Sequence, residues 1–261
     1  MPRPQAIPMW DMMIINKLND IINNSQTSDP RYMISSFIKQ NILIINSLTI
    51  KEVADGSHVS KAMVSKFVKE LGYDNFAELK ESCSMYVGSL GLKDRYFQLD
   101  SDFRSNSSDL VVRMNNLLTN TVHQINYNDL DMLVEDIRNC SCLFLLGHGE
   151  AKGLCSMIQI ELDALQIPII VVDVDFRKEY RIGDHAVFLI ISVNGNTLMY
   201  NHRTITKILK QKQKAWLITC NQEIAFAGKK IYVPSVDSTL NKINIRFVTD
   251  LIIARLQQNQ E

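Results

Sequence analysis

The sequence has no excess of either charge, because 28 basic and 28 acidic side chains give a formal net charge of zero at pH 7. Overall electrostatics therefore do not indicate a nucleic-acid partner, and any such contact must come from a local basic cluster. The five cysteines include no C-x-x-C pair, which excludes the usual zinc and disulfide frameworks. We expect free thiols in a reducing compartment, and neither a metal nor a cofactor.

Long apolar runs are also lacking. No run reaches the roughly 18 residues that a membrane span needs, and the first residues contain no continuous apolar stretch of the kind found in signal peptides. With 46% hydrophobic and 21% charged residues, the composition is that of a globular protein. We expect a cytoplasmic chain with no membrane partner.

A length of 261 residues favours two domains. Up to about residue 90 the apolar residues recur at helical spacing, without strand-like alternation. A polar, glycine-containing stretch follows. We therefore predict an all-helical domain over 1–83, a linker over 84–108 and a second domain over 109–261.

The second domain contains five short, continuous apolar runs, which begin at Cys142, Ile167, His185, Lys214 and Lys229. Such runs are typical of strands covered on both faces. Helical segments lie between most of them, for example over 151–166 and 197–213, and a last helix is expected over 239–257. This alternation predicts an α/β domain with a five-stranded parallel sheet, so that the fold class is α + α/β.

Residues 48–80 predict a helix-turn-helix. Thr49 followed three residues later by Glu52 is a capping box, and Asp55-Gly56 is expected to supply the turn. Ser60 then caps a second helix, and Gly72 ends it in the C′ position.

The second helix of this motif is amphipathic, and its outward face carries short polar residues and lysines. This arrangement suits a DNA major groove, because the early residues can reach base edges while lysines neutralise phosphates. An ordinary solvated helix with surface lysines is the alternative. The candidate DNA-binding residues are Ser60, Lys61, Ser65, Lys66 and Lys69.

This segment resembles the helix-turn-helix of the RpiR family of bacterial regulators. The resemblance is carried by Val59-Ser60, Val64-Ser65-Lys66-Phe67, Leu71-Gly72-Tyr73, Phe76 and Leu79-Lys80. It implies a transcription regulator of carbohydrate metabolism genes that binds a double-stranded DNA operator. Met63 and Lys66 depart from the usual threonine and arginine, and a lysine cannot make the bidentate fork of arginine with guanine.

Two loops of the second domain are candidates for ligand binding. Each follows an expected strand and opens an expected helix, which is where ligands of open parallel sheets bind. Glycines there let the backbone approach a ligand, and helix N-terminal amides attract an anion. The candidate residues are Gly147, His148, Gly149 and Glu150 in the first loop, and Ser192, Asn194, Gly195, Asn196 and Thr197 in the second.

The resemblance to RpiR regulators extends into these loops, because those regulators continue into a sugar-isomerase-type (SIS) domain that binds phosphosugars. The second loop is similar to the SIS pattern S-x-S-G-x-T at Ser192, Gly195 and Thr197, whereas Asn194 replaces a serine. Ala151 replaces a serine after the first loop, and Glu150 adds a negative charge. The effector implied is a phosphosugar or a related sugar derivative such as an amino sugar.

Two other functions stay open. One is a phosphosugar isomerase with an accessory helical domain; since no acid–base pair is recognisable, we expect no enzyme activity. The other is a regulator whose second domain only dimerises, with no effector at all. DNA half-sites require a homodimer or a higher homo-oligomer. The operator, the effector and the sign of regulation are not encoded in any recognisable pattern.

Overall fold

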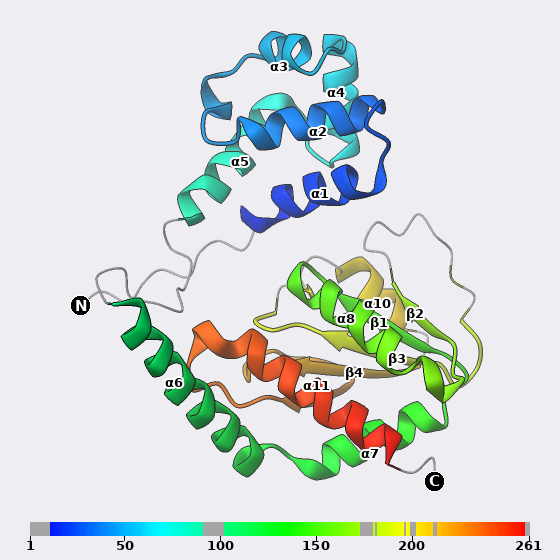
Figure 1. Ribbon diagram of the computed structural model, residues 1–261. Coiled ribbons are helices and arrows are strands. Elements are labelled where there is room, and N and C mark those ends of the chain that lie inside the picture. Colours follow the sequence, from blue (N-terminus) through cyan, green and yellow to red (C-terminus); the bar gives the residue numbers. More distant parts are fainter. Residues whose placement is uncertain are drawn as a thin grey trace. The chain divides into compact units, whose positions relative to one another are not determined.

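The chain forms two compact units, Met1–Lys93 and Asp94–Glu261, each of which is described by itself (Figure 1). The structure is a computed structural model. It describes residues 11–90, 102–172, 180, 182–195, 197–198, 202–210 and 213–258.

The first unit is all-helical, as the apolar spacing predicts. Its elements are α1 (Asp11–Asn24), α2 (Pro30–Gln40), the 3-10 turn η1 (Ile45–Ser47), α3 (Ile50–Gly56), α4 (Lys61–Glu70) and α5 (Phe76–Leu90). Their inward faces form one core, in which Ile14, Leu18, Ile34, Phe67 and Leu79 are almost completely buried.

The helix-turn-helix has the caps that the sequence predicts. The Thr49 hydroxyl accepts from the Glu52 amide at 3.2 Å, and the Glu52 carboxylate accepts from the Thr49 amide at 2.7 Å, which completes the capping box. Ser60 caps α4, and Gly72 has a left-handed φ of 87°.

The turn between α3 and α4 lies later than predicted. Asp55 and Gly56 belong to α3, and the chain turns over Ser57 and His58, with His58 at a φ of 55°. Gly56 serves a different purpose, because a Cβ built on it would lie 2.0 Å from the Phe37 ring of α2. Its lack of a side chain allows α2 and α3 to approach each other closely.

The linker predicted over 84–108 is helical at both ends. α5 continues to Leu90, and α6 (Phe103–Gln124) begins before 109. Asp102 caps α6 by accepting from the Ser105 amide at 3.0 Å, and the Ser107 hydroxyl donates to the Phe103 carbonyl at 2.8 Å. The small polar residues that suggested a loop therefore form the start of a helix, because they satisfy its backbone groups locally.

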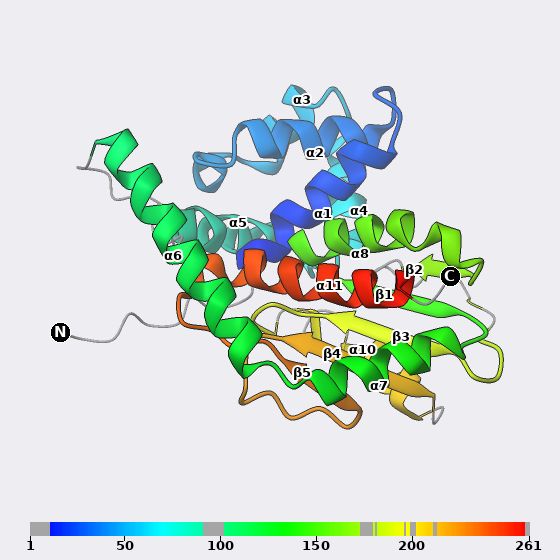
Figure 2. The ribbon, with the colours of Figure 1, turned by 60° about the horizontal axis from the view of Figure 1, so that its bottom comes forward.

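The second unit contains the predicted five-stranded parallel sheet (Figure 2). Its strands are β1 (Leu143–Gly147), β2 (Ile169–Val171), β3 (Val187–Ile191), β4 (Lys214–Thr219) and β5 (Lys229–Tyr232), in the order β2-β1-β3-β4-β5. β1 and β3 are buried along their whole length, which explains their continuous apolar sequences.

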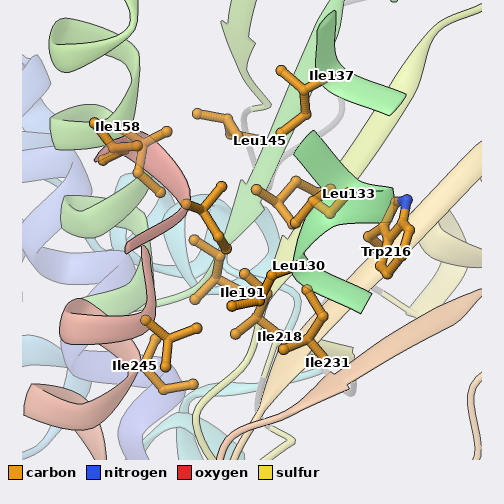
Figure 3. Packing of buried hydrophobic residues seen from close by; sticks show 14 of the residues in the cluster. Leu130, Leu133, Ile137, Leu145, Ile158, Ile191, Trp216, Ile218, Ile231 and Ile245 are labelled. Atoms are coloured by element: carbon orange, nitrogen blue, oxygen red, sulfur yellow. The ribbon is translucent and has the colours of Figure 1, made fainter. Parts of the chain in front are cut away.

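Helices cover both faces of this sheet. One face packs on α7 (Tyr127–Arg138), α8 (Glu150–Glu161) and α11 (Asn241–Gln257), and Figure 3 shows Leu145, Ile191 and Ile218 in that core. The other face packs on α10 (His202–Lys210) through Ile205 and Ile208. The helix predicted over 151–166 ends earlier, because a 3-10 turn (Asp163–Leu165) leads to Gln166 with a φ of 57°.

The topology brings two loops together at the carboxyl ends of the strands. From β1 the chain crosses to β2 on one side, whereas β3, β4 and β5 follow on the other side. β1 and β3 are neighbours, with Gly147 opposite Ile191. The loops after these two strands therefore meet at the point where the strand order reverses, which is where open α/β sheets bind ligands.

Candidate functional site

The outward face of α4 consists of the residues that the sequence singled out. Val64, Phe67 and Val68 are buried against the first unit's core. The opposite face is exposed and carries Ser60, Lys61, Ser65, Lys66 and Lys69. Ser60 also has a structural role, because its hydroxyl accepts from the Met63 amide at 3.2 Å. Its proton can still be donated outward.

The lysines of this face can contact DNA phosphates, because neighbouring acidic side chains do not hold them in strong ion pairs. Lys66 lies 3.9 Å from Glu70, but the two side chains are 72% and 37% exposed, so this ion pair contributes little. Another basic residue, Lys17 of α1, is used inside the domain. Its ammonium donates to the Leu71 carbonyl at 2.5 Å and lies 5.2 Å from the centre of the Tyr73 ring. It thereby stabilises the carboxyl end of α4.

The first loop of the second unit brings α8 close to the end of β1. A Cβ built on Gly147 would lie 2.4 Å from the Ala151 carbonyl oxygen, so only glycine permits this approach. Gly149 precedes α8 with a φ of 58° and makes no side-chain cap. The Ala151 and Lys152 amides in the first turn of α8 donate to the His148 and Gly149 carbonyls at 3.2 and 3.1 Å, so backbone groups cap this turn.

The second loop is bonded to the first. The His148 amide donates to the Thr197 hydroxyl at 3.2 Å, and the Thr197 amide donates to the Ser192 hydroxyl at 3.1 Å. Ser192 and Thr197 are each only 1% exposed. The two predicted loops therefore form one site, which we call the effector site: residues 147–150 and 192–197, without Asn196, which lies outside the described residues.

The Thr197 hydroxyl makes two hydrogen bonds inside the protein. It donates to the Ile191 carbonyl at 2.6 Å and accepts from the His148 amide. A hydroxyl has one proton, so donation to a ligand would break the bond to Ile191. Thr197 holds the loops together, and the Ser192 hydroxyl accepts from the Thr197 amide.

Three residues at the effector site have no signal in the sequence motifs. Asn241 donates to the Asn194 side-chain oxygen at 3.3 Å, and Ser235 donates to Asn241 at 2.6 Å. Lys242 lies 3.4 Å from the Glu150 carboxylate. An asparagine at the start of a helix is typical of a cap, so no local pattern indicates that α11 lies beside these loops.

The Lys242–Glu150 pair changes the electrostatics expected of the site. Glu150 alone would repel an anion, but the ammonium of Lys242 offsets its charge. The two side chains are 68% exposed for Glu150 and 43% exposed for Lys242, so solvent screens the pair and it can open at little cost.

The thiols are structural. Burial raises the pKa of Cys83, Cys155 and Cys220 to about 12, which keeps them protonated and unreactive at neutral pH. Within the described ranges, no cluster of three or more metal-type side chains occurs. No helix in the same ranges is long and apolar enough to cross a membrane.

Comparisons with known proteins match the first unit and the chain as a whole. Residues 12–88 match the helix-turn-helix domain of the rpiR family. An uncharacterized HTH-type transcriptional regulator of Haemophilus influenzae is 20% identical, with 95% of this chain and 91% of that protein covered.

Two solved structures align with parts or most of the chain. The Vibrio vulnificus NanR protein complexed with ManNAc-6P aligns with a TM-score of 0.48 at 12% identity, covering 95% of this chain and 92% of that one. The sugar isomerase domain of an RpiR transcription factor from Sphaerobacter thermophilus aligns with a TM-score of 0.47 at 14% identity, covering 57% of this chain and 88% of that one.

Proposed function

We propose that this chain, a transcription regulator whose helix-turn-helix domain belongs to the RpiR family, reads its operator with α4 and binds a phosphosugar or related sugar derivative at the effector site. The DNA-binding half is supported by the exposed face of α4, where polar residues lie near the N-terminus and lysines behind them. Such a helix can enter a major groove with its first turn toward the bases.

The effector half depends mainly on one observation, the bond from the His148 amide to the Thr197 hydroxyl. This bond joins the loops after β1 and β3. The groups near this bond include the first turn of α8, the Ser192 hydroxyl and the ammonium of Lys242. A hydroxyl and an ammonium are donors suited to a phosphate.

The DNA-binding half is tested with an operator selected from random duplexes by the full-length protein. Lys66→Ala and Lys69→Ala should weaken binding and lower the slope of log K against log salt by about 0.9 for each lost phosphate contact. Lys39→Ala is the control, because this lysine of α2 bonds to Asn19 at 2.6 Å. Unchanged affinity and slope in both α4 variants would show that α4 does not bind in the major groove.

The effector half is tested by thermal shift against inorganic phosphate, hexose 6-phosphates, amino sugars, N-acetylmannosamine 6-phosphate and nucleotides. For a phosphosugar that binds, Glu150→Gln should strengthen binding, because it removes a repulsive charge and releases Lys242. Glu161→Gln is the control, since Glu161 ends the same helix and pairs with Arg246 at 2.9 Å. Ser192→Ala should weaken binding through the loss of a hydroxyl donor.

A panel in which no compound stabilises the protein would favour the third function, a second domain that only dimerises. We propose a homodimer or higher homo-oligomer in either case, because two half-sites require two α4 helices. Sedimentation equilibrium at micromolar concentration measures this directly. A monomer on the selected operator would contradict it.

Isomerase activity is the alternative from a different class. Ring opening and proton transfer need a positioned acid and base. Glu150 is exposed and paired with Lys242, so it is poorly placed for this task. We expect no interconversion of aldose and ketose phosphates above background. Turnover that disappears with Glu150→Gln would overturn the regulator-only function.

A further inference from the structure

Two asparagines are buried in the first turns of α11. Asn241 is 4% exposed and Asn244 is completely buried. Asparagine is a poor helix former, and a buried amide is costly unless its hydrogen bonds are made. Both side chains bond to partners outside α11, which indicates that these residues fix the position of other elements.

Asn241 connects α11 to the effector site. Its amide nitrogen donates to Asn194 at 3.3 Å, and its oxygen accepts from Ser235 at 2.6 Å. The next residue, Lys242, lies 3.4 Å from Glu150 at the start of α8. The N-terminus of α11 therefore contacts both loops of the effector site.

Asn244 connects the same end of α11 to α6. Its oxygen accepts from the buried Thr121 hydroxyl at 2.8 Å, while its nitrogen donates to the Pro234 carbonyl at 2.6 Å. Figures 1 and 2 both show α6 beside the orange, N-terminal end of α11.

A second contact joins α6 to the residues before α11. The Arg113 guanidinium donates to Asp237 at 2.8 Å through Nε and to the Thr239 hydroxyl at 2.8 Å. Asp237 in turn caps the 3-10 turn η3 (Ser238–Leu240) by accepting from the Thr239 amide at 3.0 Å. Residues 235–244, which we call the coupling segment, are thus bonded on one side to the effector loops and on the other to α6.

We propose that the coupling segment transmits the state of the effector site to α6, with Asn241 as the positioning residue. α6 is the first described helix after the helix-turn-helix unit in chain order. A ligand that displaces Asn194 or Glu150 changes the partners of Asn241 and Lys242. The same short segment is bonded to Arg113 and Thr121 of α6, so a change in its position also shifts α6. This inference rests on the proposed function, since it assumes that the effector site is occupied in the regulated state.

The test uses the full-length protein without ligand, so that its outcome does not depend on the identity of the effector. Amide hydrogen exchange is measured residue by residue in Asn194→Ala. This substitution is at an exposed position and removes the contact with Asn241. Exchange over residues 113–121 of α6 should accelerate by about threefold or more, as expected for residues that belong to one hydrogen-bond network. Asn139→Ala is the control, because Asn139 bonds to Glu135 at the end of α7.

Coupling between two sites is reciprocal, which gives a second readout. Arg113→Gln should accelerate exchange of the Thr197 and Leu198 amides in the effector loop, whereas Arg255→Gln, which loses a pair with Asp131 at 3.1 Å, should not. Acceleration in both directions supports the proposal. Exchange that changes only beside each substitution overturns it and leaves ligand binding untouched. If no compound of the ligand panel binds but exchange accelerates in both directions, the proposed effector is rejected and the coupling is retained.

Discussion

Asp136 of α7 holds together the end of the sheet opposite the effector site. Asp136 is 8% exposed. Its carboxylate accepts from Lys214 at 2.5 Å and from the Trp216 indole at 2.9 Å, and lies 3.6 Å from Lys229. Burial alone would raise the pKa of Asp136, but the hydrogen bonds and the two ammonium groups outweigh it and lower the pKa. The carboxylate is therefore charged at neutral pH, and its partners are side chains of the second unit.

Asp136→Asn should lower the free energy of unfolding at pH 7 by about 1–3 kcal/mol, because hydrogen bonds to a charged acceptor are lost or weakened. Asp131→Asn removes an exposed pair with Arg255 and should cost less than about 1 kcal/mol. Urea denaturation of the three proteins measures both values. Equal losses in the two variants would mean that Asp136 contributes no more to stability than a surface carboxylate.

The same residue predicts a pH dependence with a defined sign. The folded-state pKa of Asp136 lies below the unfolded value of 3.8, so its stabilisation is fully present above pH 3.8 and is lost as pH falls through the folded pKa. The difference in unfolding free energy between the wild type and Asp136→Asn should therefore be constant near neutrality and shrink in acid. A difference that grows below pH 3.8 would reverse the sign and refute this assignment.

Thr197 gives another test at the scale of one residue. Thr197→Val keeps the shape but removes the hydroxyl from the His148 amide and the Ile191 carbonyl, and should lower the free energy of unfolding by about 1–3 kcal/mol. Thr197→Ser should retain most of the stability. If valine and serine behave alike in chemical denaturation, the hydroxyl does not join the two loops.

Among the elements, those with a strong local signal could be predicted from the sequence. The five strands are short apolar runs, and the helix-turn-helix caps follow from Thr49, Glu52 and Ser60. The wrong predictions arose where one residue type has two uses. Gly56 is typical of a turn, yet it permits a close helix contact. Serines are typical of loops, yet they begin α6.

Part of the effector site could not be predicted because its partners are distant in the chain. The loops at 147–150 and 192–197 stand out locally, since glycines and hydroxyls follow apolar strands. Asn241 and Lys242 lie more than 40 residues later on a helix without a motif. Only the packing of α11 beside the loops reveals them. The sequence indicates the Thr197 hydroxyl as a site group, but its hydrogen-bond partners inside the protein depend on tertiary geometry.

Two glycines in helices should respond to alanine with opposite signs. Gly56→Ala forces a Cβ into the Phe37 ring and should destabilise the protein by about 1–3 kcal/mol, as overpacking does. A Cβ built on Gly153 of α8 would meet no atom within 4 Å, so Gly153→Ala should stabilise the protein by about 0.4–1 kcal/mol. Thermal denaturation compares the two, and a stabilising Gly56→Ala would show that α2 and α3 are not in close contact.

At the scale of the whole molecule, the two units have separate cores. Ile14, Phe67 and Leu79 belong to a cluster made only of the first unit, whereas Leu145 and Ile218 belong to one made only of the second. Each cluster contains enough large buried side chains to support cooperative folding. The chain should therefore show two calorimetric transitions rather than one, and a fragment of residues 102–258 should keep the second.

Separate cores also predict which transition each partner shifts. A ligand that binds only a native unit stabilises it by about 2.7 kcal/mol at a hundred times its dissociation constant. For a unit of the second domain's size this is a rise of about 5–11 °C in Tm, since 1 kcal/mol corresponds to about 2–4 °C.

The selected operator should raise only the transition of the first unit, and an effector-site ligand only that of the second. Glu150→Gln should enlarge the second shift at a fixed subsaturating concentration of an anionic ligand, while Lys66→Ala should reduce the first. A ligand that raises the transition of the first unit, and is unaffected by Glu150→Gln, would bind outside the effector site.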